Sequence, residues 1–547
     1  MAPPAQDPWG EVTVTVSGSA SDATPVTLQH VSFGEVLLCS GQSNMVDSVA
    51  AASSGGINAS DPRIQSKTWP TIRLFQVITT LAFPPWAVND SHTHRDLPVY
   101  VNRSAPRCGW GSVKDQANHP NPSKTVCQTW QVAAPGVTDD FSAECFYAGM
   151  YLVESGAIPA GMNLGLVQSA YSGTSMEVWT PPEGFDGCPN KTKTSAEDAL
   201  PFALLASASA GHFNPQVTQV HGTPTTGKWV LPSAPSCLWN TMVFPIAGVG
   251  LRAVLWNQGE SNMGDTFDRF SCVFQNMIAS WRKHWGIGDF PFLATQIGDQ
   301  GGSWPAYVGA PRDAQLSILP GMGRTVNGGL VSAYDQGDHC GGGNCPDQTC
   351  VWRQHTGNTC SDGKCCTNPF GFFGVHSRFK QEIGRRMALV VRHACNLSAS
   401  PVDWNGPSPT GATTADGGAS IKVHWTTTAA PAGAAAGTGP VNVVAKPTRD
   451  CWECCDTTKA HDVFQVTTNF PQTDGQERGQ VWTNVSWAYD APSQIVTLAP
   501  LSPAPRGHPY VRVRYAASLW PQCAFYSSSN NVPAFSFSDL GIANATI

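Results

Sequence analysis

The stretch Glu35-Val-Leu-Leu-Cys-Ser-Gly-Gln-Ser-Asn-Met45 predicts a buried strand that runs into a turn. Its apolar part, Val36 to Leu38, ends in polar residues, and the alanine-rich chain after them is typical of a helix. The turn presents one serine, Ser43, at the carboxyl end of a strand, where open α/β sheets keep their functional sites. Backbone N–H groups at the start of the following helix could face a developing negative charge there.

Two interpretations of Ser43 are open from these residues alone. It could be a nucleophile, or it could be the cap of the helix, which is a common position for serine and asparagine. The stretch is also not a Gly-x-Ser-x-Gly elbow, because Met45 stands where the last glycine would be. Other segments of the chain have to decide between the two.

Length, composition and charge limit the class of protein. A chain of 547 residues is long enough for two to four domains with a large core. Its net charge of −7 and its lack of a basic block argue against nucleic acid as a partner. We see no apolar run near the about 20 residues that a transmembrane helix needs, so we expect no membrane span.

Cysteines and glycosylation motifs point to an exported protein. There are 18 cysteines, and a disulfide-bonded, glycosylated chain belongs in the secretory pathway. We therefore expect a secreted or lysosomal glycoprotein, although no signal peptide is visible in the first residues. The seven Asn-x-Ser/Thr motifs begin at Asn58, Asn89, Asn102, Asn190, Asn396, Asn484 and Asn544.

Strands alternate with helices in the first two thirds of the chain. This alternation predicts an α/β fold with an open, mostly parallel sheet that is covered on both faces. Further strands are expected at 164–168, 251–256, 290–296 and 329–334, and helices at 141–153, 238–244, 267–285 and 376–394.

The flanking segments have a different texture. Residues 11–16 alternate between polar and apolar, and we interpret residues 1–34 as the remnant of an N-terminal β-domain. Alternating runs at 420–425, 494–499 and 510–515 predict an antiparallel β-rich domain over 396–547. The α/β domain then spans 35–395, with insertions at about 50–140 and 339–368.

Several polar signatures follow the predicted strands, and in a parallel sheet such positions meet at one edge. Acyl transfer needs a nucleophile, a base and donors that face the oxyanion. Ser43 can attack, and His376 can accept its proton. The backbone N–H groups of Ser43 and Gly173, with the Gln258 side chain, can hold the tetrahedral oxygen. The signatures are Ser43, Ser172-Gly173-Thr174, Gln258-Gly-Glu260, Asp335 and, at the head of the last helix, His376.

Four ordered blocks resemble those of the sialate O-acetylesterases, a family of the SGNH-type hydrolases. The resemblance implies a flavodoxin-like three-layer α/β/α domain with an accessory antiparallel β-sandwich or jelly-roll-like domain. It implies removal of acetyl groups from O-acetylated sugars, most of all sialic acids, through an acetyl-serine and without a metal or organic cofactor. The blocks are Ser40-Gly-Gln-Ser-Asn-Met45, Ser169 to Thr174, Trp256-Asn-Gln-Gly-Glu-Ser261 and Phe370-Gly-Phe-Phe-Gly-Val-His376.

By that likeness Ser43 is the nucleophile, His376 is the base, and Gly173 and Gln258 are oxyanion partners. Glu260 and Asn44 join them as oxyanion- or substrate-binding residues, and Glu260 is expected to shape the site or to pair with a serine or asparagine.

The chain also departs from the pattern. Many SGNH hydrolases carry an aspartate three residues before the histidine, where this chain has Phe373. The acid that orients His376 must come from elsewhere or be missing, and Asp335 and Asp338 are our candidates, with Glu260 third. Ser172 stands where the family often has glycine, and the family's first β-domain is longer than residues 1–34.

Other side chains invite functional interpretations. The cysteines between Cys340 and Cys366, and those between Cys451 and Cys455, could bind zinc. Neither group has the two Cys-x₂-Cys motifs that together indicate a zinc site, so we favour disulfides in an inserted loop. Sugar stacking and contact with an acidic sugar are further hypotheses, for Trp179, Trp256 and Trp304 and for Arg312 and Arg353 respectively.

Two alternative functions stay open. The same chemistry could act on another acetylated polysaccharide, such as acetylxylan, or the chain could be a carbohydrate-binding protein that has lost catalysis. The sequence does not decide the sugar, the position of its acetyl group or the oligomeric state.

Overall fold

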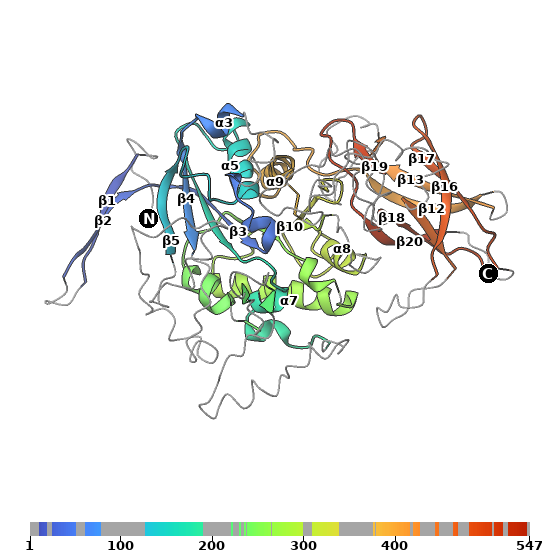
Figure 1. Ribbon diagram of the computed structural model, residues 1–547, viewed down its shortest axis with the longest axis horizontal. Coiled ribbons are helices and arrows are strands. Elements are labelled where there is room, and N and C mark those ends of the chain that lie inside the picture. Colours follow the sequence, from blue (N-terminus) through green and yellow to red (C-terminus); the bar gives the residue numbers. More distant parts are fainter. Residues whose placement is uncertain are drawn as a thin grey trace, which may run out of the picture.

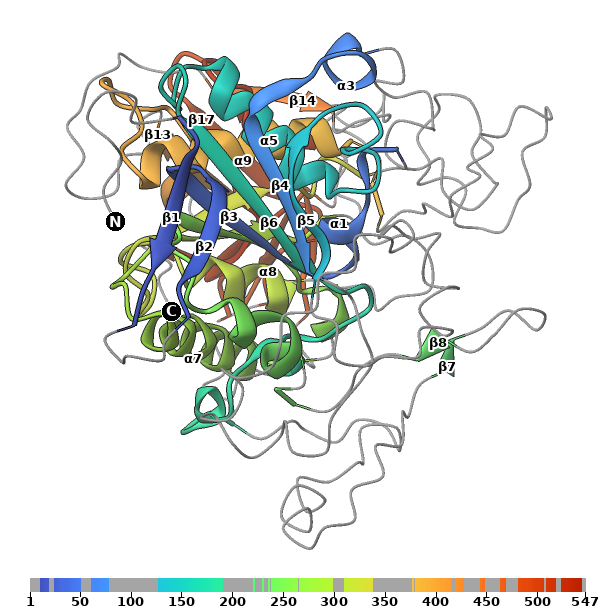
Figure 2. The same cartoon turned by 90° about the vertical axis from the view of Figure 1, so that its left-hand side faces the viewer.

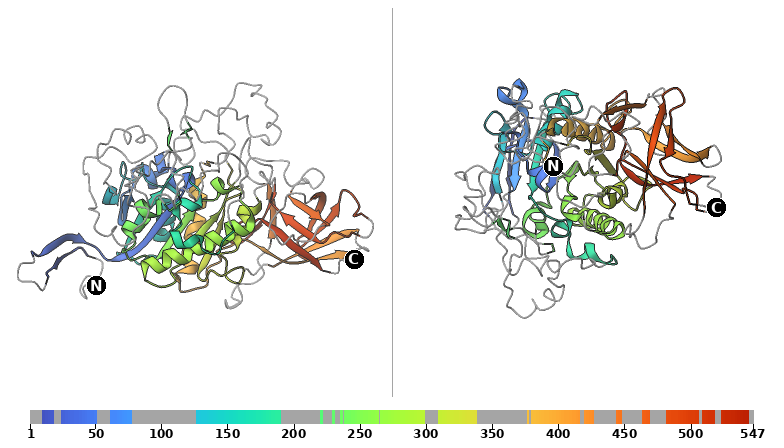
Figure 3. Two further views of the ribbon diagram at one scale, coloured as in Figure 1. Left: turned by 90° about the horizontal axis from the view of Figure 1, so that it is seen from below. Right: turned by 45° about the vertical axis from the view of Figure 1, so that its right-hand side comes forward.

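An α/β body, a β-ribbon before it and a β-barrel after it make up the computed structural model of this chain (Figure 1). The ribbon and the barrel lie at opposite ends of the body (Figure 3). The structure describes residues 10–18, 24–50, 61–77, 126–189, 220–221, 229–230, 235–236, 238–263, 265–298, 309–337, 376–377, 379–415, 419–426, 443–447, 463–468, 481–505, 508–517 and 523–543.

A seven-stranded sheet forms the centre of the body. Its strands are parallel except β5, which pairs antiparallel with β4 at one edge. Every residue of β6, β9, β10 and β11 is buried, as expected of a parallel sheet with both faces covered. The order is β11 (Gly328–Ser332), β10 (Phe292–Gln296), β9 (Ala253–Asn257), β3 (Gly34–Gly41), β6 (Asn163–Ala170), β4 (Trp69–Val77) and β5 (Val126–Ala133).

Helices cover both faces of this sheet. On one side lie α5 (Ala143–Glu154) and α9 (Lys380–Ala394), and on the other lie α7 (Phe267–Trp285) and α8 (Gly309–Leu316), as Figure 2 shows. Helix α7 has the predicted bounds. The last helix begins at Lys380, so the prediction that it begins at His376 is wrong by one turn.

The segment 50–140 contains two strands of the sheet that the sequence analysis did not predict. Strand β4 pairs with β6, and Ile72 and Leu74 on it are fully buried. The surrounding Pro, Gly, Trp and Asn residues hide this alternation of buried and exposed positions in the sequence. Strands β4 and β5 therefore belong to the central sheet, although they lie in the segment that the sequence marked as an insertion.

A closed barrel, not a sandwich or a jelly roll, forms the C-terminal domain. Strand β12 pairs antiparallel with β13 and parallel with β20, where Ala412 is opposite Ile542, and this second pairing closes the sheet. The barrel strands are β12 (Ser408–Ala415), β13 (Ser420–Thr426), β17 (Ile495–Pro500), β16 (Thr483–Asp490), β15 (Phe464–Thr467), β18 (Arg512–Tyr515) and β20 (Phe537–Ala543). A separate pair joins β14 (Val443–Pro447) and β19 (Cys523–Ser527).

Short elements complete the description. The N-terminal ribbon is β1 (Val12–Val16) paired with β2 (Val26–Val31). The others are α1 (Ser43–Val46), α3 (Pro62–Gln65), η4 (Met176–Trp179), η5 (Pro182–Phe185), β7 (Val220–His221), β8 (Trp229–Val230), the π-helix η8 (Trp239–Val243), η9 (Phe244–Ile246) and η10 (Glu260–Asn262). Within the described ranges, no helix is both long and apolar enough to cross a bilayer.

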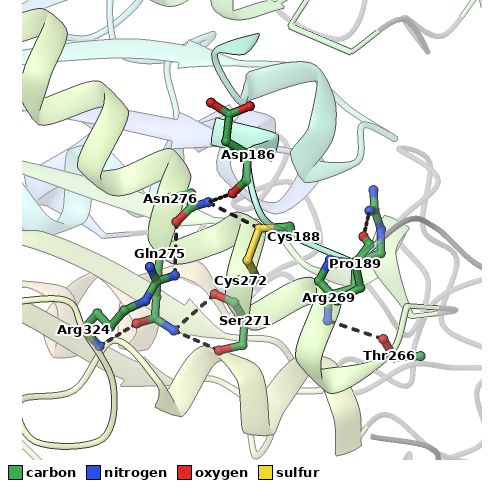
Figure 4. The surroundings of a disulfide bond; sticks show 10 residues. All are labelled: Asp186, Cys188, Pro189, Thr266, Arg269, Ser271, Cys272, Gln275, Asn276 and Arg324. Atoms are coloured by element: carbon green, nitrogen blue, oxygen red, sulfur yellow. Dashed lines mark hydrogen bonds between the residues drawn. A yellow bond between two sulfur atoms is a disulfide. The ribbon is translucent and has the colours of Figure 1, made fainter. Parts of the chain in front are cut away.

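Two disulfides fix helices of the body. Cys39 on β3 is bonded to Cys145 on α5. Cys188 is bonded to Cys272 on α7, next to the hydrogen bond from Asn276 to the Asp186 carbonyl (Figure 4). The cysteines at 340–366 and 451–455 lie outside the described residues.

Candidate active site

Three neighbouring strands end at the same level of the sheet. Gly41 of β3 is paired with Ala170 of β6 and with Asn257 of β9. The Tyr171 N–H donates to the Gly41 carbonyl at 3.0 Å, so the pairing continues beyond the strands. This register places the segments that contain Ser43, Gly173 and Gln258 at one edge of the sheet.

Gly41 allows β3 and β9 to approach closely just before Ser43. Its φ is +133°, and a Cβ at this position would lie 2.1 Å from the Asn257 carbonyl oxygen. The next residue, Gln42, donates its N–H to the same oxygen at 2.9 Å. A glycine is therefore required here by both conformation and space.

Ser43 begins the four-residue helix α1 and is 3% exposed. The helix ends where the Asp47 N–H donates to the Ser43 carbonyl at 2.8 Å. Four residues before Ser43, Cys39 is tied to α5 by its disulfide. The predicted nucleophile thus lies on a turn that is held on both sides.

Gln258 is buried and contacts the turn that contains Gly173. Its Nε2 donates to the Thr174 carbonyl at 3.2 Å and to Asn262 Oδ1 at 2.6 Å. Gly173 itself is exposed and has a φ of +72°. Both amide hydrogens of Gln258 therefore have protein acceptors, and its role as an oxyanion donor, which would need one of them to be released, stays a prediction.

Asn262, which the sequence analysis did not single out, fixes the orientation of the Gln258 amide. Its Oδ1 accepts from the Met176 N–H at 2.8 Å, so this atom is an acceptor. Its Nδ2 donates to Glu177 Oε2 and to Asp265 Oδ2, both at 2.9 Å. The only signal in the sequence is its position four residues after Gln258, directly after the third block.

His376 lies four residues before α9 and is partly exposed. Burial lowers the pKa of His376 below its usual value, the charge of Asp47 acts to raise it, and the charge of Lys380 acts to lower it. The imidazole is therefore held towards its neutral form, which is the form that a general base needs. It also senses a charge from α1, the helix that begins with Ser43.

Lys380 joins the segment behind His376 to the turn of Ser43. This lysine is fully buried at the first position of α9. Its Nζ donates to Asn44 Oδ1 at 2.6 Å and to Glu144 Oε1 at 3.1 Å, and it forms an ion pair with Asp47 Oδ2 at 3.2 Å. Lys380 thereby ties Asn44, the residue after Ser43, to the helix that begins four residues after His376.

Asn44 also binds Glu260, one of the pairings expected for this carboxyl group. The Asn44 Nδ2 donates to Glu260 Oε1 at 2.7 Å, and both side chains are buried. Burial raises the pKa of Glu260 and also that of Glu144, although Lys380 acts to lower both. Perturbed carboxyl groups of this kind are typical of functional sites.

Asp335, the first candidate for the orienting acid, has other partners. Arg386 donates to both of its oxygens, at 2.6 and 2.7 Å, and Tyr526 of strand β19 donates to Oδ2 at 2.8 Å. Burial acts to raise the pKa of Asp335, but the charge of Arg386 lowers it below its usual value. These contacts give Asp335 a place in the contact between the body and the C-terminal domain and do not support it as the acid behind His376. Asp338 lies outside the described residues.

The expected sugar contacts find little support. Trp179 and Trp256 are fully buried in the core, so neither can stack on a sugar. Arg312 is also fully buried and donates to the Ile297 and Ala516 carbonyls, at 3.0 and 2.9 Å. These three hypotheses are wrong, because the side chains face the interior. Trp304 and Arg353 lie outside the described residues.

A cavity of about 400 Å³ lies elsewhere, between α7 and the turn at Arg324. Gln275 and Asn276, which Figure 4 shows beside the disulfide, are among the residues that line it. None of the predicted site residues lines this cavity. In the described part of the chain, no group of three or more His, Cys, Asp or Glu side chains is arranged to hold a metal ion.

Comparisons with known proteins agree with the blocks in the sequence. The sialate O-acetylesterase of Rattus norvegicus is 29% identical over 288 residues, which are 50% of this chain and 46% of the rat protein. That of Homo sapiens is 25% identical over 394 residues, 70% of this chain and 57% of the human protein. The chain thus spans about half the length of these curated relatives. No family model matches the sequence.

A solved structure shares the fold. The crystal structure of a carbohydrate acetylesterase from Xanthomonas citri superposes with a TM-score of 0.53 at 16% identity, covering 94% of this chain and 82% of that chain. The α/β body and its accessory β-domain therefore occur together in another protein.

Proposed function

We propose, from the premise that this chain is a relative of the sialate O-acetylesterases, that it is a serine esterase that removes acetyl groups from O-acetylated sugars. One observation carries the proposal. The bond between Lys380 and Asn44 places the residue after Ser43 against the residue that begins the helix behind His376. This bond supports a site in which the proposed nucleophile and base, 333 positions apart in sequence numbering (376 minus 43), act together.

In the first half of the reaction, Ser43 Oγ attacks the acetyl carbonyl while His376 accepts its proton. The tetrahedral oxygen accepts hydrogen bonds from the backbone N–H groups of Ser43 and Gly173. These residues follow the neighbouring strands β3 and β6. His376 then gives the proton to the sugar oxygen, and the deacetylated sugar leaves. The acetyl group stays on Ser43 as an ester.

In the second half, His376 accepts a proton from water, which attacks the carbonyl of the acetyl-serine. The bond from the acetyl carbon to Ser43 Oγ then breaks, His376 returns the proton to Ser43 Oγ, and acetate leaves. The low pKa of His376 supports this role, because the imidazole is neutral in the pH range where water has to be activated. A serine–histidine pair works without an orienting acid, only more slowly. Asp47, whose charge acts on His376, is better placed for electrostatic support than Asp335.

The substrate and location are the finer parts of the proposal. We propose O-acetylated sialic acids as substrate, on the names of the relatives, and acetylxylan-type polysaccharides as the alternative. Two disulfides support a place in the secretory pathway, secreted or lysosomal. Acetate release from O-acetylated sialic acid and from acetylxylan, measured side by side, separates the two substrates.

The nucleophile is tested by Ser43→Ala. We expect hydrolysis of p-nitrophenyl acetate to fall by roughly 10⁴–10⁶-fold, as in other enzymes that lose a catalytic serine. The matched control is Ser40→Ala on strand β3, three residues before Ser43, because the Ser40 hydroxyl is buried and has no hydrogen-bond partner among the described residues. A Ser43→Ala protein with wild-type turnover would contradict the proposal. A wild-type protein that binds acetylated sugars without hydrolysing them would contradict it as well.

A further inference from the structure

Lys380 is a buried cation beside the site that the proposed mechanism does not use. Lysine is almost never fully buried unless it is paired. Its ammonium group has three hydrogens and lies within 3.2 Å of three acceptors, which belong to Asn44, Glu144 and Asp47. Two of these residues lie on or directly after α1, and the third lies on α5.

The helix of Lys380 is pressed directly against α5. One turn after Lys380, a Cβ at Gly384 would lie 2.5 Å from the Cβ of Tyr147 and 3.0 Å from the Glu144 carbonyl oxygen. Gly384 therefore lets the two helices approach as closely as backbones can. This close packing fixes the position of the Lys380 backbone, from which the side chain extends towards α1.

The buried carboxyl groups around Lys380 need its positive charge for compensation. Asp47 and Glu144 contact it directly, and Glu260 is joined to it through Asn44. A neutral side chain at position 380 would leave these buried carboxylates without compensation. The segments that carry them, α1, α5 and η10, surround the Ser43 turn.

We propose that Lys380 is a positioning residue for the reaction, which clamps the turn of Ser43, through Asn44 and Asp47, to the start of the helix behind His376. The inference rests on the proposed function, since it gives a role within that site. Displacement of a reacting group by about 1 Å can cost about 10²-fold in rate, so a loosened clamp should reduce kcat more than it changes KM. The positive charge also acts directly on His376.

Lys380 and Asp47 act on the pKa of His376 in opposite directions. Lys380 lowers the pKa of His376, whereas Asp47 raises it. Removal of the ammonium group should therefore raise the pKa of His376, and the remaining charge of Asp47 acts in the same direction. A purely structural lysine would leave this titration unchanged.

The experiment compares Lys380→Met and Lys380→Arg with the matched control Arg386→Met. Arg386 is another fully buried cation on the same helix, and it binds Asp335 instead of the site. For each protein, kcat and KM are measured on p-nitrophenyl acetate, and the His376 titration is followed by NMR, with His376→Ala to assign the signal.

We expect kcat to fall by about 10²-fold in Lys380→Met, with most of the loss recovered in Lys380→Arg. The His376 titration should move to higher pH in Lys380→Met and stay in place in Arg386→Met. An unchanged titration, or a kcat loss no larger than in the control, overturns the inference.

A second variant covers the case in which Lys380→Met does not fold. Asp47→Asn keeps the shape of the side chain and should move the His376 titration to lower pH, and an upward or absent shift overturns the inference. A wild-type protein that does not hydrolyse acetyl esters contradicts the proposed function instead, and the titrations then decide the role of Lys380 on their own.

Discussion

Lys380 and Arg386 are two buried cations on helix α9, and the pKa of a carboxyl partner is raised beside Lys380 but lowered beside Arg386. Arg386 donates to both oxygens of Asp335 and lowers the pKa of that carboxyl group in spite of its burial. Lys380 is shared between Asp47 and Glu144, and burial still raises the pKa of Glu144. A planar guanidinium matches one carboxylate, whereas a single ammonium group has to serve several.

The difference separates a structural contact from a functional one. Around Arg386, Tyr526 and Gln336 complete the hydrogen bonds of Asp335, and the cluster joins the body to strand β19 of the C-terminal domain. Around Lys380, the cluster includes Glu260, whose Oε2 is buried and has no hydrogen-bond partner in the described part of the chain. Gln336 Oε1 in the Arg386 cluster also lacks a hydrogen-bond partner among the described residues, so our distinction rests on the bond that joins the Lys380 cluster to Asn44, the residue after Ser43.

The largest expected effect on stability belongs to the structural cluster. Arg386→Met leaves Asp335 buried without its cation and should reduce the free energy of unfolding by about 3–5 kcal/mol. Urea unfolding measures this loss, and the folded fraction should keep kcat within a few-fold of wild type. The control Lys283→Met, an exposed cation on α7, should change little. A large kcat loss in Arg386→Met with full stability would reverse the comparison.

Gly41→Ala tests the strand edge on the other side of the comparison. The new Cβ would overlap the Asn257 carbonyl oxygen, in addition to backbone strain of about 1–3 kcal/mol. We expect a loss of stability together with a displaced Ser43 and low turnover. Gly136→Ala is the matched control, because Gly136 also has a positive φ but no atom within 4 Å of such a Cβ. Equal effects in the two variants would show that the close approach to β9 is unimportant.

Asp47→Asn should have a smaller effect, on pH dependence. The base has to be neutral, so kcat/KM falls as pH decreases through the pKa of His376, which burial holds below its usual value of about 6.5. Asp47 acts to raise this pKa, so its removal should move the acidic limb of kcat/KM to lower pH. Asp335→Asn should leave the limb in place. A shift in Asp335→Asn and none in Asp47→Asn would make Asp335 the relevant acid.

Much of the fold could be predicted from hydrophobic periodicity. The strand before Ser43 and helix α7 follow from apolar runs, and each strand end carries a polar signature that the sheet order then brings together. Strand β4 was missed because Pro70 and polar residues interrupt its pattern. The barrel was mistaken for a sandwich because closure depends on the β12–β20 pairing, which is long-range.

The polar interior was the least predictable part. Lys380 stands on the apolar stripe of α9, together with Ile383 and Met387, and this position was a signal that it is buried. Its partners could not be identified, because they come from α1 and α5, far away in the sequence. Trp179 and Arg312 have the chemistry of sugar contacts, and only their burial excludes that role.

The most direct test is the labelling of the protein by a fluorophosphonate probe, with peptide mapping and with rates compared between variants. We expect the label on Ser43, far slower labelling of His376→Ala, slower labelling of Lys380→Met, and a wild-type rate for folded Arg386→Met. A label on another serine, or equal rates in wild type and His376→Ala, would contradict the proposed mechanism.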